Sequence, residues 1–225
     1  MAIDNINLRK LLGLFYLPPN KLKTELRKDI YQENKKKEGG DGGGGDFHIP
    51  FWSDAKAHVA GTHDLSLLTQ DRIEKNRRSR FRLYPLLRDG FLQWWNEKRR
   101  WSNQEFELLQ GSVKGRHQLP ELDATVKVEN ILALKIDDDT HRLIYPYFKE
   151  EPRLQPEGAR IGLWLLNATM NDYHVEDMRI LDVLRSQSFS TSEFPLQGNE
   201  EELFISKYSY ILEMWEDLKK EYPGY

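Results

Sequence analysis

The segment from residue 125 to residue 185 constrains the fold most, because apolar runs alternate in it with polar joints. The first two apolar runs are rich in β-branched residues, which favour strands, and the aspartates between them are typical of a turn. In chain order we expect a strand over 125–136, a turn at Asp137-Asp138-Asp139, a strand over 141–148, a helix over 158–170 and a strand over 178–184. This order indicates a single platform of the βαβ type.

The composition is that of an ordinary globular protein. The 225 residues are enough for one domain, or for one core with a smaller satellite. A content of 39% hydrophobic and 31% charged residues excludes wholesale disorder. The formal net charge of −3 gives no global reason to bind nucleic acid, so any such reason must come from a local patch. Because the chain has no cysteine, it has no disulfide, thiol nucleophile or cysteine-ligated metal.

The sequence also bears on localisation. No apolar run approaches the roughly 18 residues that a membrane-spanning helix needs, so we expect no membrane partner. An apolar patch at residues 11–17 lacks a basic region before it and a small-residue cleavage site after it. We therefore do not expect a signal peptide, and the features together predict a cytoplasmic protein.

A glycine-rich stretch at residues 35–46 suggests how the chain is divided. Glycines offer no side chain to bury and lose much backbone entropy on ordering, so we expect a flexible linker. It is not expected to cradle phosphate, because no strand precedes it and no Gly-Lys-Ser/Thr follows. The expected regions are an N-terminal helical arm (1–34), the linker (35–46), a helical region (47–118) and an α/β core with a C-terminal helix (119–225). The predicted fold class is α/β (or α+β), with a small mixed sheet flanked by helices and a helical N-terminal half.

Periodicity and helix-breaking residues predict the remaining elements. They are a short helix over 6–17 that stops before Pro18, an exposed helix over 20–34, a helix with Ser53 as its N-cap, a helix over 64–79 capped by Asp64, a helix from Pro85, a loop over 111–119, a hairpin over 186–189 and 194–196, and a terminal helix over 200–222. The helix from Pro85 is expected to bury a bulky face made of Leu83, Leu86, Leu87, Phe91, Trp94 and Trp101.

A basic run is the first candidate for function. Between Asp71 and Trp101, ten basic residues face four acidic ones, with aromatic residues interleaved. Such a surface can neutralise phosphates and release counterions from nucleic acid. A solvated helix face and a dock for an acidic partner are the alternatives. The residues expected to contact phosphates are Arg77, Arg78, Arg80, Arg82, Arg99 and Arg100.

Histidines are the second candidate. The pair His63-Asp64 is similar to the metal-binding dipeptide of HD phosphohydrolases, but those sites also need an earlier histidine and a distant aspartate. His58 and His63 are five residues apart, which is half a turn off a shared helix face, and whether His48 joins them is left open. The aspartates at 137–139 lack the glycine and bidentate glutamate of a calcium loop. We therefore predict no metal ligands.

Taken together, residues 125–222 resemble the core of the PD-(D/E)XK nuclease superfamily, in its RecB-like branch. In that family two strands carry an acid and then a D/E-x-K signature, followed by a helix, often with Gln-x-x-x-Tyr, a strand and a terminal helix. The resemblance places Glu129 at the first metal-binding acid and Lys149 at the signature lysine. These two residues are the candidate catalytic residues, and the N-terminal half is not covered.

The sequence departs from the family at two positions. The central acid of the signature falls on Tyr147, and the glutamine falls on Arg160. A phenol, with a pKa of about 10, cannot replace a bridging carboxylate at neutral pH. Glu150 or Glu151 could stand in only with a change of register. Catalysis is therefore in doubt, and Mg²⁺ is expected as a cofactor only if the site is active.

These observations predict a non-catalytic or weakly catalytic nuclease-like protein that binds nucleic acid. The resemblance alone implies a subunit of a prokaryotic DNA-processing or antiviral defence assembly, and hence a protein partner. One alternative is an interaction subunit without nucleic-acid binding, whose partner contacts the glycine loop and a surface of Trp94, Trp95 and Trp101. The other is an active metal-dependent phosphodiesterase.

Overall fold

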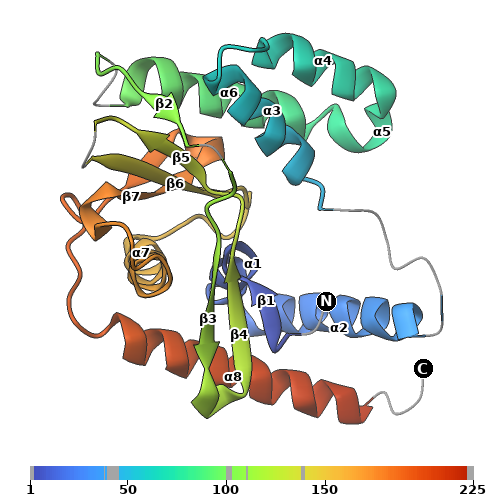
Figure 1. Cartoon of the computed structure of the whole chain (residues 1–225). Helices are drawn as coiled ribbons and strands as arrows, with labels where there is room; N and C mark the ends of the chain where they lie inside the picture. The colour runs from blue at the N-terminus through green and yellow to red at the C-terminus, as the bar shows by residue number, and fades with distance from the viewer. Residues whose placement is uncertain are drawn as a thin grey trace.

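The computed structural model describes residues 3–37, 39, 46–99, 103–109, 111–137 and 140–221. The architecture is mixed α/β, as predicted, with a five-stranded and a three-stranded sheet. Figure 1 shows the larger sheet with helices α3 to α6 on one side and α7 on the other, while α2 and α8 lie further from it. Most of the predicted linker, together with Asp138 and Asp139 of the predicted turn, lies outside the described residues.

The five-stranded sheet contains most of the segment that the sequence singles out. Its order is β2-β5-β6-β7-β8, and its elements are β2 (Glu107–Leu108), β5 (Leu132–Lys135), β6 (His141–Tyr147), β7 (Met178–Asp182) and β8 (Gln187–Phe189). β6 and β7 are parallel, and the other neighbours are antiparallel. Helix α7 (Pro156–Thr169) joins the two parallel strands. The predicted order of two strands, a helix and a further strand is thus confirmed from β5 onward.

The three-stranded sheet connects the N-terminus to the middle of the chain. β1 (Asn5–Asn7) runs parallel to β4 (Ala124–Val128), and β3 (Gly115–Leu119) runs antiparallel to β4. Two predictions are wrong in part here: the helix expected over 6–17 begins only at Leu8, and the loop expected over 111–119 contains β3. Both strands are short, and β1 is specified by its partner more than 100 residues away, so local periodicity carried little signal for them.

The predicted strand over 125–136 is also wrong, because it is divided between the two sheets. β4 ends at Val128 and β5 begins at Leu132. Between them, Asn130 has a φ of 67°, in the left-handed region that asparagine tolerates better than most residues. The polar pair Glu129-Asn130 marks this break in the sequence, but the apolar runs on both sides of it were read as one continuous strand.

One face of the large sheet is covered by α3 (Ile49–Val59), α4 (Leu65–Lys75), α5 (Arg77–Arg80), α6 (Leu83–Gln93) and the π-helical turn η1 (Trp94–Lys98). The side chains that pack onto the sheet from these helices include Trp52, Leu87, Phe91 and Trp94, and all four are buried. The buried face predicted for the helix near Pro85 is therefore confirmed in part. Leu86 is 49% exposed, which corrects the prediction for that residue, and Trp101 lies outside the described part of the chain.

The N-termini of α4 and α3 can be compared with the N-cap residues predicted from the sequence. The Asp64 side chain accepts a hydrogen bond from the Leu67 amide at 3.0 Å, so its predicted N-cap role is confirmed. The Ser53 prediction is wrong, because α3 begins four residues earlier, at Ile49, with Pro50 in its first turn. Proline fits there because first-turn amides have no intrahelical acceptor.

The opposite face packs against α7, and α1 (Leu8–Leu14) joins the same core; α8 (Glu200–Glu221) packs on α7, and α2 (Pro19–Lys37) lies against α8. The terminal helix is confirmed almost residue for residue, and its Tyr208 hydroxyl donates to the Ile3 carbonyl at 2.6 Å. Helix α2 was predicted to be exposed, but Leu22, Leu26 and Ile30 on one side of it are buried. The predicted hairpin is wrong as well: β8 pairs with β7, and residues 194–196 form no strand.

Candidate nucleic-acid interface

Tyr147, at the position where the nuclease signature has an acid, is a buried structural residue. It ends β6 opposite Asp182 of β7, and its hydroxyl donates to the Pro152 carbonyl at 2.6 Å. Burial is the largest cause that raises the pKa of this phenol, and the charge of Asp182 adds to it. The hydroxyl therefore stays protonated at neutral pH and supports the loop after β6.

Glu129 lies in the loop between β4 and β5, and helix α3 fixes the backbone of that loop. The Trp52 indole donates to the Asn130 carbonyl at 2.5 Å, and the Lys56 ammonium donates to the Ile131 carbonyl at 2.6 Å. The Glu129 side chain is half-buried and makes no hydrogen bond or ion pair within the described residues. Its charge contributes to the raised pKa of Tyr145, in the middle of β6.

The contact of Lys56 with this loop gives a testable pH dependence. Burial lowers the pKa of Lys56 from its ordinary value of 10.5 to about 8. Between these two values the unfolded chain holds a proton that the folded chain has lost, so the free energy of unfolding should rise with pH across this window. Urea titrations from pH 7 to pH 10 should show this rise in the wild type relative to Lys56→Met, whose own curve lacks it. Parallel curves for the two proteins would contradict the prediction.

Lys149 lines a small pocket at the end of β6, which we call the Lys149 pocket. The pocket has a volume of about 150 Å³, and its lining residues are Asn7, Arg9, Lys10, Asp46, His48, Phe148 and Lys149. The His48 ring stacks on Phe148 with centroids 4.9 Å apart, and the Arg9 guanidinium lies 5.3 Å from the centre of the same ring. The alkyl part of Lys149 runs over Gly13, where an added Cβ would lie 3.1 Å from the lysine Cε.

Most of the positive charge in the Lys149 pocket is already balanced. Arg9 pairs with Asp46, and Lys10 pairs with Asp29 at 2.5 Å. Burial by itself would raise the pKa of Asp46, but its hydrogen bond to His48 and the charge of Arg9 outweigh burial and lower that pKa to about 2. Lys149 has no carboxylate within ion-pair distance among the described residues. It is the cation of this pocket that remains for an external anion.

Glu129 and Lys149 do not touch each other. Arg9 and Glu129 both act electrostatically on Tyr145; the Arg9 amide donates to the Tyr145 hydroxyl at 2.8 Å, and the Arg9 side chain lines the Lys149 pocket. Within the described residues no three His, Asp or Glu side chains gather closely enough to hold a metal ion. The sequence pointed to Lys149, but it did not point to Arg9 or Lys10, which only the fold brings there.

Within the basic run, the structure separates paired from unpaired cations. Arg72 forms a two-pronged ion pair with Asp54, and other ion pairs join Lys75 to Asp71, Arg82 to Glu150 and Arg88 to Asp89. Arg82, a predicted phosphate contact, is thus engaged by both oxygens of Glu150 at 2.6 Å. Each neighbouring carboxylate reduces the attraction that the basic residue exerts on a phosphate.

Helix α5 contains basic residues without such a neighbouring carboxylate in the described chain. Arg77 and Arg78 are exposed and have no carboxylate within ion-pair distance in the described part of the chain. Arg80 packs its guanidinium 5.4 Å from the centre of the Tyr84 ring. Phe81, directly after the helix, is 57% exposed. We call Arg77, Arg78, Arg80 and Phe81 the α5 surface.

The other two predicted phosphate contacts lie apart from this surface or outside the described residues. Arg99 follows η1, and its guanidinium lies 3.8 Å from the centre of the Trp95 ring. Burial lowers the pKa of Arg99, although an arginine keeps its charge at any physiological pH. Arg100 is outside the described residues, so the prediction for it stays a prediction.

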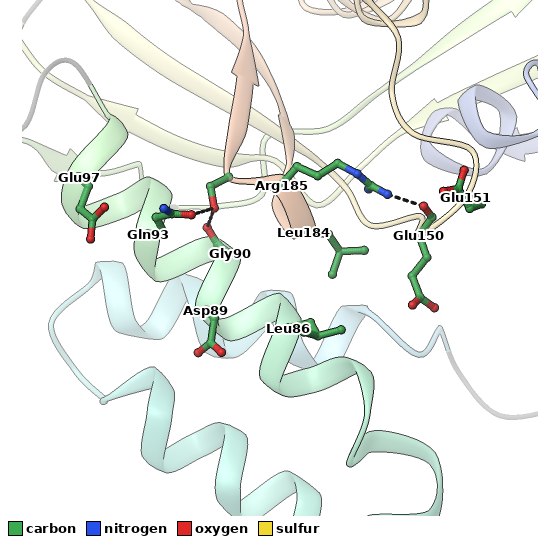
Figure 2. A pocket seen from close by; sticks show the side chains of 10 residues that line it. Leu86, Asp89, Gly90, Gln93, Glu97, Glu150, Glu151, Leu184 and Arg185 are labelled. Carbon is green, nitrogen blue, oxygen red and sulfur yellow. Dashed lines mark hydrogen bonds between the residues drawn. The ribbon is translucent and has the colours of Figure 1, made fainter.

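A wide cleft lies between α6 and the loop after β6 and has a volume of about 770 Å³. Figure 2 shows Asp89, Gly90, Gln93 and Glu97 on one wall and Glu150, Glu151, Leu184 and Arg185 on the other. Carboxylates outnumber the single arginine in this lining. The cleft is therefore a poor site for a phosphate, despite its volume.

Two of the three tryptophans of the interaction hypothesis, Trp94 and Trp95, do not form a surface. Trp94 is 2% exposed and Trp95 is 7% exposed, because both pack with Phe91 under the large sheet. An indole buried in the core cannot contact a partner. Trp101 and most of the glycine loop lie outside the described residues.

The histidines separate into two groups. His58 accepts a hydrogen bond from the Leu65 amide at 3.3 Å and lies with His63 and the capping Asp64 in the turn between α3 and α4. His48 lies at the other end of α3, stacked on Phe148. The four candidate residues therefore do not converge, and those in the turn have structural hydrogen bonds.

Comparison of the chain with protein-family models gives no match, and comparison with curated proteins gives none either. Among the described residues, no helix combines the length and the apolar character needed to cross a bilayer.

Proposed function

We propose that this protein binds nucleic acid through the phosphate backbone and acts as a nuclease-like protein without catalytic activity. The observation that carries the proposal is the α5 surface, where Arg77 and Arg78 are exposed without a neighbouring carboxylate in the described chain. Such charges attract counterions or phosphates, and nucleic acid supplies a row of phosphates. Four other basic residues of the run, Arg72, Lys75, Arg82 and Arg88, have acidic neighbours that reduce their attraction for a phosphate.

Phe81 adds a second component to this surface. An aromatic ring that is exposed beside arginines can stack with an unpaired base, as in proteins that bind single strands without sequence preference. A duplex keeps its bases stacked inside and offers no such contact. We therefore expect single-stranded DNA or RNA to bind more tightly than duplex DNA.

The nuclease-like part of the proposal rests on the resemblance and on the order of β5, β6, α7 and β7, which that family shares. The proposed lack of catalysis follows from Tyr147, whose buried hydroxyl is committed to the Pro152 carbonyl. Metal-dependent phosphodiester cleavage needs carboxylates that hold the ion and activate water. Glu129 and Lys149 would then be what remains of such a site, and membership of a larger DNA-processing or defence assembly is part of the same proposal.

The experiment compares wild type with Arg77→Gln/Arg78→Gln in fluorescence-anisotropy titrations of single-stranded DNA, single-stranded RNA and duplex DNA. Salt is varied from 50 to 200 mM. If both arginines contact phosphates, the double variant should bind all sequences more weakly, and the slope of log affinity against log salt should fall in magnitude by about 2. The matched control is Lys219→Gln/Lys220→Gln, with the same change of net charge at the far end of α8.

Two results would contradict the proposal. The first is an affinity that does not depend on salt, or that both double variants reduce equally. The second is magnesium- or manganese-dependent cleavage of the same oligonucleotides that Glu129→Ala abolishes, since this would identify an active phosphodiesterase.

A further inference from the structure

A second pocket is more basic than the Lys149 pocket, and of its basic residues only Arg99 is among the phosphate contacts predicted from the sequence. It lies beside Trp94 at the edge of the large sheet and has a volume of about 360 Å³. Four basic side chains line it, against one carboxylate, that of Glu193; the four are Lys98, Arg99, Arg179 and Arg185. Serines from β8 and from the residues on either side of β8 form much of the remaining wall. We therefore call this pocket the serine pocket.

The arginines of the serine pocket are held in place by the fold. Arg185 forms an ion pair with Asp182 at 3.2 Å and donates to the Lys149 carbonyl at 2.9 Å. Arg179 donates to the carbonyl of Met178 at 2.7 Å, and Arg99 is fixed by stacking on Trp95. Because these side chains are already ordered, binding an anion between them loses less conformational entropy than binding to mobile surface lysines.

The serines supply neutral hydrogen-bond donors to the same pocket. Ser190 and Ser192 share a hydrogen bond of 2.9 Å between their hydroxyls, and Ser188 is half-buried with no hydrogen-bond partner for its hydroxyl in the described chain. Ser188 lies in β8 between exposed Gln187 and buried Phe189. Hydroxyl donors and several fixed cations together suit a ligand with many acceptor oxygens and more than one negative charge.

We propose that the serine pocket binds a phosphomonoester. Such a group carries close to two negative charges at neutral pH and three acceptor oxygens, which matches an excess of cations better than a single carboxylate does. The volume admits the phosphate with an attached sugar or nucleoside. Both a free nucleotide and the phosphorylated end of a strand carry this group. The inference does not rest on the α5 surface or on the proposed nucleic-acid binding.

The test uses the full chain and isothermal titration with deoxyadenosine monophosphate, with adenosine as the ligand that lacks phosphate. Wild type should bind the nucleotide and not adenosine. Ser188→Glu introduces a carboxylate into the pocket and should weaken nucleotide binding by about tenfold or more. Ser112→Glu makes the same change in an exposed loop outside the pocket and should have no effect. Lys98→Gln, at the exposed end of η1, should weaken binding in the same direction without disturbing the core.

A competition experiment then distinguishes the sources of the phosphate. If an oligonucleotide with a 5′-phosphate displaces the nucleotide while the same oligonucleotide with a 5′-hydroxyl does not, the pocket accepts strand ends; if neither does, the ligand is a free nucleotide. Absence of nucleotide binding, or equal binding of adenosine, would overturn the proposal. So would unchanged affinity in both Ser188→Glu and Lys98→Gln. Loss of α5-dependent nucleic-acid binding alone would leave it standing.

Discussion

Replacing Gly90 with alanine should lower the free energy of unfolding by about 3 kcal/mol, although alanine is the better helix former. Gly90 lies in α6 where that helix meets the turn after β7, and an added Cβ would be 2.1 Å from the Val183 carbonyl oxygen. The Gly90 carbonyl also accepts a hydrogen bond from the Ser186 hydroxyl at 2.8 Å. A backbone atom cannot rotate away, so α6 would have to move off the sheet.

Thermal unfolding followed by circular dichroism should show a fall in Tm of roughly 6–12 °C for Gly90→Ala. The control is Gly13→Ala in α1, where the nearest atom to an added Cβ is the Cε of Lys149, at 3.1 Å. That atom belongs to a flexible side chain that can shift, so the control should be close to neutral or slightly stabilising. Equal Tm values for the two variants would show that α6 does not depend on this close approach.

Replacing Arg185 with methionine should cost about 3–5 kcal/mol, because it leaves a buried carboxylate without its cation. Asp182 is 1% exposed and pairs with Arg185 at 3.2 Å. The same guanidinium donates to the carbonyls of Lys149 and Glu150, so the change also releases the loop after β6. Denaturant titration should show this loss, and it should exceed that of any exposed arginine of the α5 surface.

The pH dependence identifies the cause of that loss. Burial raises the pKa of Asp182 above its ordinary value of 3.8, and removing Arg185 should raise it further. When a carboxyl group has a higher pKa in the folded chain than in the unfolded chain, the free energy of unfolding falls as the pH rises from the lower to the higher of these two values. The deficit of Arg185→Met should therefore shrink as the pH is lowered from 7 towards 4. A deficit that is constant over this range would contradict the explanation.

The double variant Arg185→Met/Asp182→Asn is the matched control. It removes the buried charge together with its partner, so it should recover part of the stability lost in Arg185→Met and lose the pH dependence. If Asp182→Asn instead costs as much stability in Arg185→Met as it costs in the wild type, the two residues are not coupled.

The local patterns of the sequence predicted the elements whose faces are set by neighbours a few residues away. The terminal helix α8 was predicted nearly to the residue, since apolar residues recur along one side of it from Phe204 to Leu218. Asp64 was recognised as an N-cap because the capping hydrogen bond joins residues that are only three positions apart in the sequence. The break at Asn130 and the short strand β1 were missed, because both depend on partners far away in the chain.

For the candidate sites the sequence supplied the charges, and the tertiary structure decided which of them remain available. The count of arginines between residues 71 and 100 could be read from the chain, but Arg82 is neutralised by Glu150, 68 residues later, while Arg77 and Arg78 meet no described carboxylate. Likewise, Arg185, in the turn between β7 and β8, enters a pocket with Lys98 only because β8 packs against η1. Coulomb interactions depend on distance in space, and separation along the chain does not determine that distance.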